Sequence, residues 1–160
     1  MAGSNNRGIL TPNINSPSTT TPTNQDLAFD PNGPGQLGAA LRDPTAAWLA
    51  YSAAMAADQM RDKRYPGLQT QSNEADAYRH ATWSYLMGRT IGNERAKSMG
   101  DAHEIDGLKS WPGMNPNSSG ERAMDLHNNL VGRNLPGGGE TQIQNAIRKG
   151  YVRMKPFPEK

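Results

Sequence analysis

The three histidines of this 160-residue chain lie in three short blocks that each contain an acidic residue. The blocks are 76–80 (DAYRH), 101–104 (DAHE) and 124–129 (MDLHNN). Each block is compatible with a helix, so helices that pack together can bring several titratable groups to one point. Imidazole and carboxylate groups in combination are typical of acid–base catalysis and of metal sites.

In the first block, Asp76 and His80 are four residues apart and share one face of a helix. A carboxylate one turn before an imidazole can accept its N–H and make the other ring nitrogen a better base or metal ligand. Arg79 lies about a quarter-turn away and can bind an anionic group. An ion pair on a helix surface has the same spacing, so a structural role stays open.

In the second block, Asp101 and Glu104 share a face, whereas His103 points about a hundred degrees away from Glu104. These side chains can serve one site only at the ridge between the two faces. The alternative is that Glu104 forms an ion pair with a nearby basic residue.

The third block places Asp125, Asn128, Asn129 and Gly132 on one face of a helix whose opposite face is apolar. Two consecutive asparagines have poor helical propensity, and a buried amide needs hydrogen-bonding partners. This face is therefore either the wall of an active site or a solvent-exposed surface. His127 falls on the apolar side, where we expect a structural histidine with a satisfied hydrogen bond.

These residues favour a small hydrolase in which an imidazole held by an acid activates water. Two imidazoles and several carboxylates can also supply three ligands to a divalent metal, Zn²⁺ or Mg²⁺, with a position left open for water. The candidate catalytic residues are His80, His103, Glu104, Asp76, Arg79 and Asn129. The candidate metal ligands are His80, His103, Asp101 and Asp125. The chain contains no cysteine, which excludes thiolate chemistry and disulfides.

Five helices are expected to position these blocks, over about 44–61, 73–91, 94–105, 119–134 and 141–149. Asp43 followed by Pro44 predicts the start of the first helix, and Ser118 with Glu121 forms a capping-box signature before the fourth. The first helix carries a stripe of large apolar side chains that includes Trp48, so we expect it to be buried. No segment alternates with a period of two. The sequence predicts an all-α domain, a compact bundle of about five helices with an extended N-terminal arm.

The composition divides the chain into three parts: a low-complexity arm over 1–40, a helical domain over 41–150 and a basic tail over 151–160. The arm is rich in Asn, Pro, Ser, Thr and Gly and has too few large apolar side chains to form a core. A Pro-rich arm is typical of a protein that contacts other subunits of a large assembly. We expect the tail to be a solvated chain end.

The net charge of +2 and the pI near 9.0 do not predict a nucleic-acid partner, and no nucleic-acid-binding motif is present. No run of about 18 apolar residues could span a bilayer, and the N-terminus lacks the pattern of a secretory signal. We therefore expect a product that is cytoplasmic at synthesis, and then virion-associated or exported without a conventional signal.

Three segments together resemble an all-helical domain found at the ends of bacterial polymorphic toxins, in predicted secreted effectors and in some phage proteins. They read NEADAYRHATWSYLMGR, AKSMGDAHE and AMDLHNNLVGR and lie within about residues 70–135. The resemblance implies a hydrolase-like, toxin-like domain that acts on a bacterial envelope or phosphodiester substrate. The positions that match are Asp76, Arg79, His80, Asp101, His103, Glu104, Asp125, Asn128, Asn129 and Gly132.

The order His80, His103-Glu104, Asp125 is also similar to the His, His-Asp, Asp ligand order of metal-dependent phosphohydrolases, with glutamate in place of the paired aspartate. The alternative to an enzyme is a non-catalytic virion or tail protein of a phage. In that case the arm would anchor the chain to neighbouring subunits, and the polar blocks would fix the register of packed helices.

Overall fold

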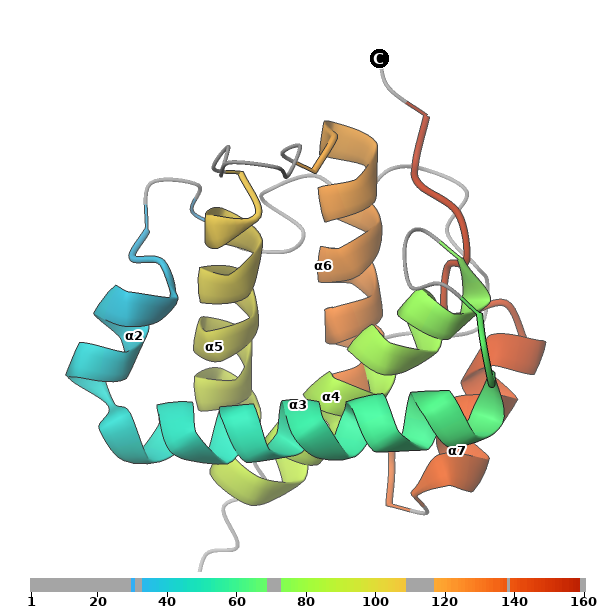
Figure 1. Ribbon diagram of the computed structural model, residues 1–160, viewed down its shortest axis with the longest axis horizontal. Helices are drawn as coiled ribbons and strands as arrows, with labels where there is room; N and C mark the ends of the chain where they lie inside the picture. The colour runs from blue at the N-terminus through green and yellow to red at the C-terminus, as the bar shows by residue number, and fades with distance from the viewer. Residues whose placement is uncertain (1–29, 31–32, 69–72, 109–116, 138, 159–160) are drawn as a thin grey trace, which may run out of the picture.

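The computed structural model describes residue 30 and residues 33–68, 73–108, 117–137 and 139–158, which form six helices and no strand (Figure 1). The predicted all-α class is confirmed, and each of the predicted helices is present. The helices are α2 (Gln36–Arg42), α3 (Pro44–Arg64), α4 (Glu74–Ile91), α5 (Asn93–Asp106), α6 (Ser119–Asn134) and α7 (Glu140–Arg148).

Side-chain caps begin three of these helices. Asp43 accepts the backbone N–H of the third residue after it at 2.9 Å, and Asn73 makes the same bond at 3.1 Å. Ser118 and Glu121 form a reciprocal capping box at the start of α6. These bonds satisfy N–H groups that a helix leaves unpaired at its first turn, so they define where α3, α4 and α6 begin.

Helix α4 is the centre of the fold. It packs against α3, α5, α6 and α7, and most of its residues between 75 and 87 are buried. Figure 1 shows α5 and α6 side by side, with α3 running across one end of the pair. A helix covered on several sides can hold polar side chains only where neighbouring helices provide partners, and α4 carries the first histidine block.

Helices α4 and α6 approach each other closely at Gly132. A Cβ added to Gly132 would lie 2.2 Å from the backbone oxygen of Ala81. At a second crossing, Gly100 of α5 faces the amide of Asn129, and a Cβ added to Gly100 would lie 3.5 Å from its Nδ2. Small residues at both crossings let the three histidine-bearing helices come together.

The expectation that the large apolar stripe of α3 is buried is wrong. Trp48, Tyr51 and Met55 are 67%, 65% and 47% exposed. The opposite face of α3 is the buried one, and it consists of small side chains, which are Ala46, Ala50, Ala53 and Ala57. Alanine allows α3 to lie close to α4, where Trp83 fills the space and donates its indole N–H to the Ala50 carbonyl at 2.9 Å.

The C-terminal residues up to 158 are not a solvated tail. Val152 and Phe157 are each only 2% exposed. The amide of Asn128 bonds both backbone groups of Arg153, and the N–H of Phe157 donates to the Gly120 carbonyl at 3.2 Å. The basic composition of this segment concealed two buried apolar residues, Phe157, which packs on α6, and Val152, which joins a core cluster formed mainly by α4 and α7.

The predicted arm falls mainly on residues 1–29 and 31–32, which lie outside the described residues, as does its expected contact with other subunits. Its last residues form α2, a helix that was not among the five predicted ones. The N–H of Gln36 donates to Asp106 at 2.9 Å and joins the start of α2 to the end of α5. The helical domain therefore begins before residue 40.

Replacing Gly132 by alanine should destabilise the fold by about 2–3 kcal/mol, because the new Cβ would collide with the α4 backbone rather than with a flexible side chain. Urea unfolding measures this. Gly137→Ala is the matched control, since its nearest atom would be an arginine nitrogen at 3.8 Å, and it should change stability by less than about 0.5 kcal/mol. Equal stabilities of the two variants would contradict the close approach of α4 and α6.

Candidate functional site

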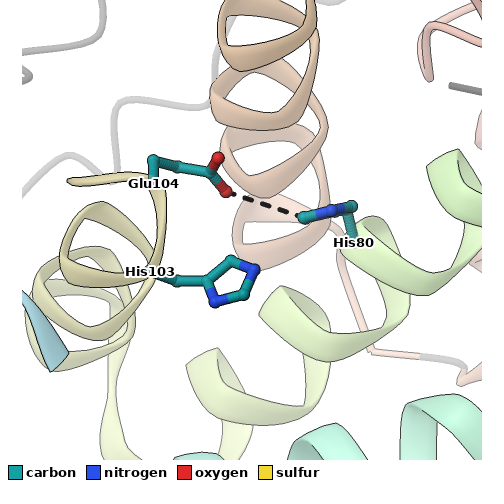
Figure 2. A group of neighbouring side chains, drawn as sticks. All are labelled: His80, His103 and Glu104. Atoms are coloured by element: carbon teal, nitrogen blue, oxygen red, sulfur yellow. Dashed lines mark ion pairs between the residues drawn. The ribbon is translucent and has the colours of Figure 1, made fainter. Parts of the chain in front are cut away.

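Helices α4, α5 and α6 each contribute buried polar side chains to one region of the core. His80 comes from α4, Glu104 from α5, and Asp125 and Asn129 from α6, and all four are between 1% and 4% exposed. Figure 2 shows His103 and Glu104 of α5 directed toward His80 of α4, with α6 behind them. The three helices thus place groups from all three histidine blocks together.

The ring of His80 has a carboxylate near each of its nitrogens. Its Nδ1 is 3.8 Å from Glu104 Oε1, and its Nε2 is 3.5 Å from Asp125 Oδ1. A third carboxylate, that of Asp76, lies 3.7 Å from Nε2. His80 Nδ1 and Asp125 Oδ1 are both fully buried and neither has a hydrogen-bond partner among the described residues. An unpaired buried polar atom is costly, so this arrangement suits a bound group between these side chains.

Arg79 supplies positive charge at the edge of the cluster. Its Nη2 lies 3.0 Å from Asp76 Oδ1 and 2.7 Å from His80 Nε2. A guanidinium can only donate, so Nε2 accepts this bond and the neutral imidazole carries its proton on Nδ1, toward Glu104. The side chain of Arg79 is 24% exposed, which places it between the buried acids and solvent.

A chain of hydrogen bonds holds Glu104 in place. Asn129 Nδ2 donates to Glu104 Oε1 at 3.2 Å, and Ser84 Oγ donates to Asn129 Oδ1 at 3.2 Å. The bond from Ser84 directs the amide so that its nitrogen faces the carboxyl group. Ser84 was not among the predicted site residues, although its position four residues after His80 places it on the same helix face.

His103 is half-buried and lies against aromatic neighbours. Its ring centroid is 5.2 Å from that of Trp83 and 6.0 Å from that of His80. Trp83, itself held by the Ala50 carbonyl, orients the imidazole of His103. Trp83 shares the helix face of His80 in the sequence pattern, but no role at the site was predicted for it.

Two groups of side chains have ligand atoms close enough to hold a metal ion. One group is His80, His103 and Glu104, and the other is Asp76, His80 and Asp125. Within each group the ligand atoms lie within 4.8 Å of one another. The predicted ligands His80, His103 and Asp125 belong to these groups, so the cluster could hold a metal ion.

Residues 37–154 match the sequence profile of the family described as "Domain of unknown function (DUF6973)". The chain belongs to this family. No curated protein and no solved structure matches the chain significantly. The family match covers all three histidine blocks and the six helices apart from the first residue of α2. The expected relation to bacterial toxins, effectors and phage proteins stays a prediction.

Burial shifts the ionisation of the DUF6973 site. It lowers the pKa of His80 well below 6.5, with Arg79 as the second cause, and lowers the pKa of His103 for the same reasons. Burial raises the pKa of Glu104 above 4.5, and it raises the pKa of Asp125 well above 3.8, with repulsion by Glu104 adding to it. The imidazoles are therefore neutral near pH 7, and Arg79 is the only cation in contact with the cluster among the described residues.

Some predicted site residues of the DUF6973 domain lie outside the cluster. Asp101 is in neither group of ligands and instead pairs with Lys97 one turn before it. Asn128 bonds the backbone of Arg153, and His127 Nε2 bonds the Tyr151 carbonyl at 2.8 Å. The satisfied hydrogen bond expected of His127 is therefore present. The polar face of α6 is buried, which excludes the solvent-exposed alternative.

None of the described helices of the DUF6973 domain combines the length and apolar content that crossing a bilayer requires.

Glu104→Gln should stabilise the metal-free protein by about 1–3 kcal/mol near pH 8, and the gain should shrink toward zero near pH 5. The folded state holds the Glu104 proton more tightly than the unfolded chain, because the pKa is raised on folding. The wild type therefore loses stability as pH rises above about 4.5, whereas glutamine does not titrate. Urea unfolding in the presence of a chelator measures the difference.

Glu94→Gln, an exposed change on the same helix, is the control and should not raise stability at pH 8, because it relieves no buried charge. A stability gain of Glu104→Gln that is the same at both pH values would contradict a protonated, buried Glu104.

Proposed function

We propose that this domain is a divalent-metal-dependent hydrolase whose metal lies between His80, His103 and Glu104. The observation that carries the proposal is the Nδ1 atom of His80, which is fully buried, has no hydrogen-bond partner within the described part of the chain and lies 3.8 Å from a buried carboxylate oxygen. A cation at this position would satisfy Nδ1 and add the positive charge that the surrounding acids lack.

Metal binding at Nδ1 requires the other tautomer of His80, with its proton on Nε2, so the bond that Arg79 Nη2 donates to Nε2 must be released when the metal binds. Asp125 and Asp76, at 3.5 Å and 3.7 Å from Nε2, can accept that proton in a hydrogen bond. A carboxylate that accepts the second N–H of a metal-bound imidazole orients the ring and raises its basicity. The second ligand group thus has a role as support for the first.

Two imidazoles and one carboxylate favour Zn²⁺ over Mg²⁺, because Mg²⁺ prefers oxygen ligands only. Three protein ligands leave a fourth position for water, and bound Zn²⁺ lowers the pKa of that water toward neutrality.

Arg79 favours an anionic substrate. It is the positively charged side chain at the partly exposed edge of the cluster and can form a bidentate contact with a phosphate oxygen pair. We therefore place a phosphodiester first and a bacterial envelope polymer second as substrates. The resemblance to toxin, effector and phage domains supports either, as well as delivery on a virion or by export after cytoplasmic synthesis.

The purified protein should bind about one equivalent of Zn²⁺, and His80→Ala or His103→Ala should weaken binding about 100-fold or more, because each removes a ligand. Isothermal titration calorimetry and elemental analysis measure this. His127→Gln is the matched control, since His127 bonds a backbone carbonyl outside the cluster, and it should bind Zn²⁺ like the wild type. Absence of a bound divalent metal in the wild type would refute the proposal.

Arg79→Lys should lower kcat/KM for bis(p-nitrophenyl) phosphate at least about tenfold without changing Zn²⁺ stoichiometry, because lysine keeps the charge and loses the planar fork. The control is Arg89→Lys, an exposed change on the same helix. Expression of the wild type should arrest growth, and expression of His80→Ala should not.

Should the metal-bound wild type cleave neither phosphodiesters nor envelope preparations and leave growth unaffected, the non-catalytic alternative is favoured. The bonds from Ser84 through Asn129 to Glu104, which join three helices, would then serve to fix helix packing.

A further inference from the structure

The outer face of α3 is unusual for the surface of a small domain. Three large apolar side chains, those of Trp48, Tyr51 and Met55, point outward, and the fully buried residues of the helix are all alanines. Helix α2 packs against α3 and adds Leu37 and Leu41, which are 75% and 78% exposed. Exposed large apolar side chains on two neighbouring helices mark a candidate site of association. We call Trp48, Tyr51 and Met55 the α3 stripe.

The spacing of the α3 stripe indicates that its partner is a helix. The three residues follow at intervals of three and four, which is the spacing of a seam between two packed helices. The stripe ends just past the middle of the helix, and beyond it the same face continues with the exposed polar Gln59 and Asp62. The apolar seam is therefore short and has a defined centre.

We infer that the α3 stripe is the interface of a homodimer in which α3 pairs antiparallel with α3 of a second copy of this chain. A two-fold axis between Tyr51 and Ser52 places Trp48 of each subunit opposite Met55 of the other. This pairing sets a thioether against an indole ring, which is a favourable contact. It is also self-complementary, as a two-fold interface must be.

The exposed area is adequate for this partner. At their observed exposures, the α3 stripe and the two leucines of α2 present on the order of 600 Å² per subunit, or about 1,200 Å² for both, which is at the lower end of the range for specific interfaces. Two aromatic residues near the centre are the kind that dominate binding energy. Antiparallel pairing also aligns the two helix dipoles favourably.

The full-length chain should be dimeric in sedimentation equilibrium at micromolar to submillimolar concentration. Tyr51→Glu should make it monomeric, because a charge would be buried at the two-fold axis, and Gln59→Glu should leave the dimer intact. Both residues are exposed within the subunit, so helicity and thermal unfolding should stay unchanged. A wild type that is monomeric throughout, or a dimer that survives Tyr51→Glu, would overturn the inference.

The antiparallel register has its own test, which uses the absence of cysteine from the chain. Ser52→Cys should crosslink efficiently to its own copy with a short bis-maleimide, because the two positions differ by about 1.5 Å along the paired helices. Gln59→Cys should not, because its two copies would be about 22 Å apart along the axis. Equal crosslinking of both variants would indicate parallel helices, and crosslinking of neither would show that α3 does not meet its copy.

Discussion

The burial of several carboxylates around one imidazole is the constraint on which the rest of this structure depends. Ligand oxygens of Asp76 and Asp125 lie within 4.8 Å of each other beside His80, and Glu104 faces the opposite ring nitrogen. Two ionised acids at that separation repel each other by about 3–4 kcal/mol at an effective dielectric of 20. Arg79 offsets part of this repulsion, and the raised pKa values of Glu104 and Asp125 reduce it further by keeping protons on the acids.

A fold that carries such a cluster must hold it rigidly from several sides. Helix α4 supplies His80 from the centre of the bundle, and close approach at Gly132 and Gly100 brings α6 within reach of both α4 and α5. The amide of Asn129 then reaches Glu104 through well-defined hydrogen bonds. The packing devices and the polar cluster are therefore parts of one arrangement. Burying these acids lowers the stability of the folded state. Such a loss of stability is typical of a functional site rather than of a core optimised for folding.

The two proposals assign different roles to two parts of the domain. The cluster reaches solvent through the half-buried side chains of Arg79 and His103, which come from α4 and α5. The fully buried residues of α3 are all alanines and Met60 packs on the core near the end of the helix, whereas the α3 stripe faces outward and is available for association. A dimer formed through α3 would not use the side chains of the cluster, which come from α4, α5 and α6. The metal-site proposal and the dimer proposal can therefore fail independently of each other.

Local signals in the chain specified nearly all of the helices, because caps and breakers act over a few residues. Asp43, Asn73 and the Ser118–Glu121 pair each began a helix at the expected position. The sequence also predicted the types of residue at the site, because each block contains a histidine close to an acid. Helix α2 was missed because its seven residues are too few for a clear helical period and it has no side-chain cap.

Packing between helices determined which face of each helix is buried and which side chains reach the cluster. A helical stripe does not reveal which side faces the core, so Trp48 was assigned inward although alanines fill that side. For the same reason, the sequence could not tell Asp101 from Glu104, three residues later. Asp101 forms an ion pair along its own helix, whereas Glu104 reaches the cluster. The role of Ser84 and the burial of Phe157 depend on contacts across 45 and 37 residues of sequence, respectively. Such contacts form only when the chain is folded, because no local interaction along one helix distinguishes its neighbours in space.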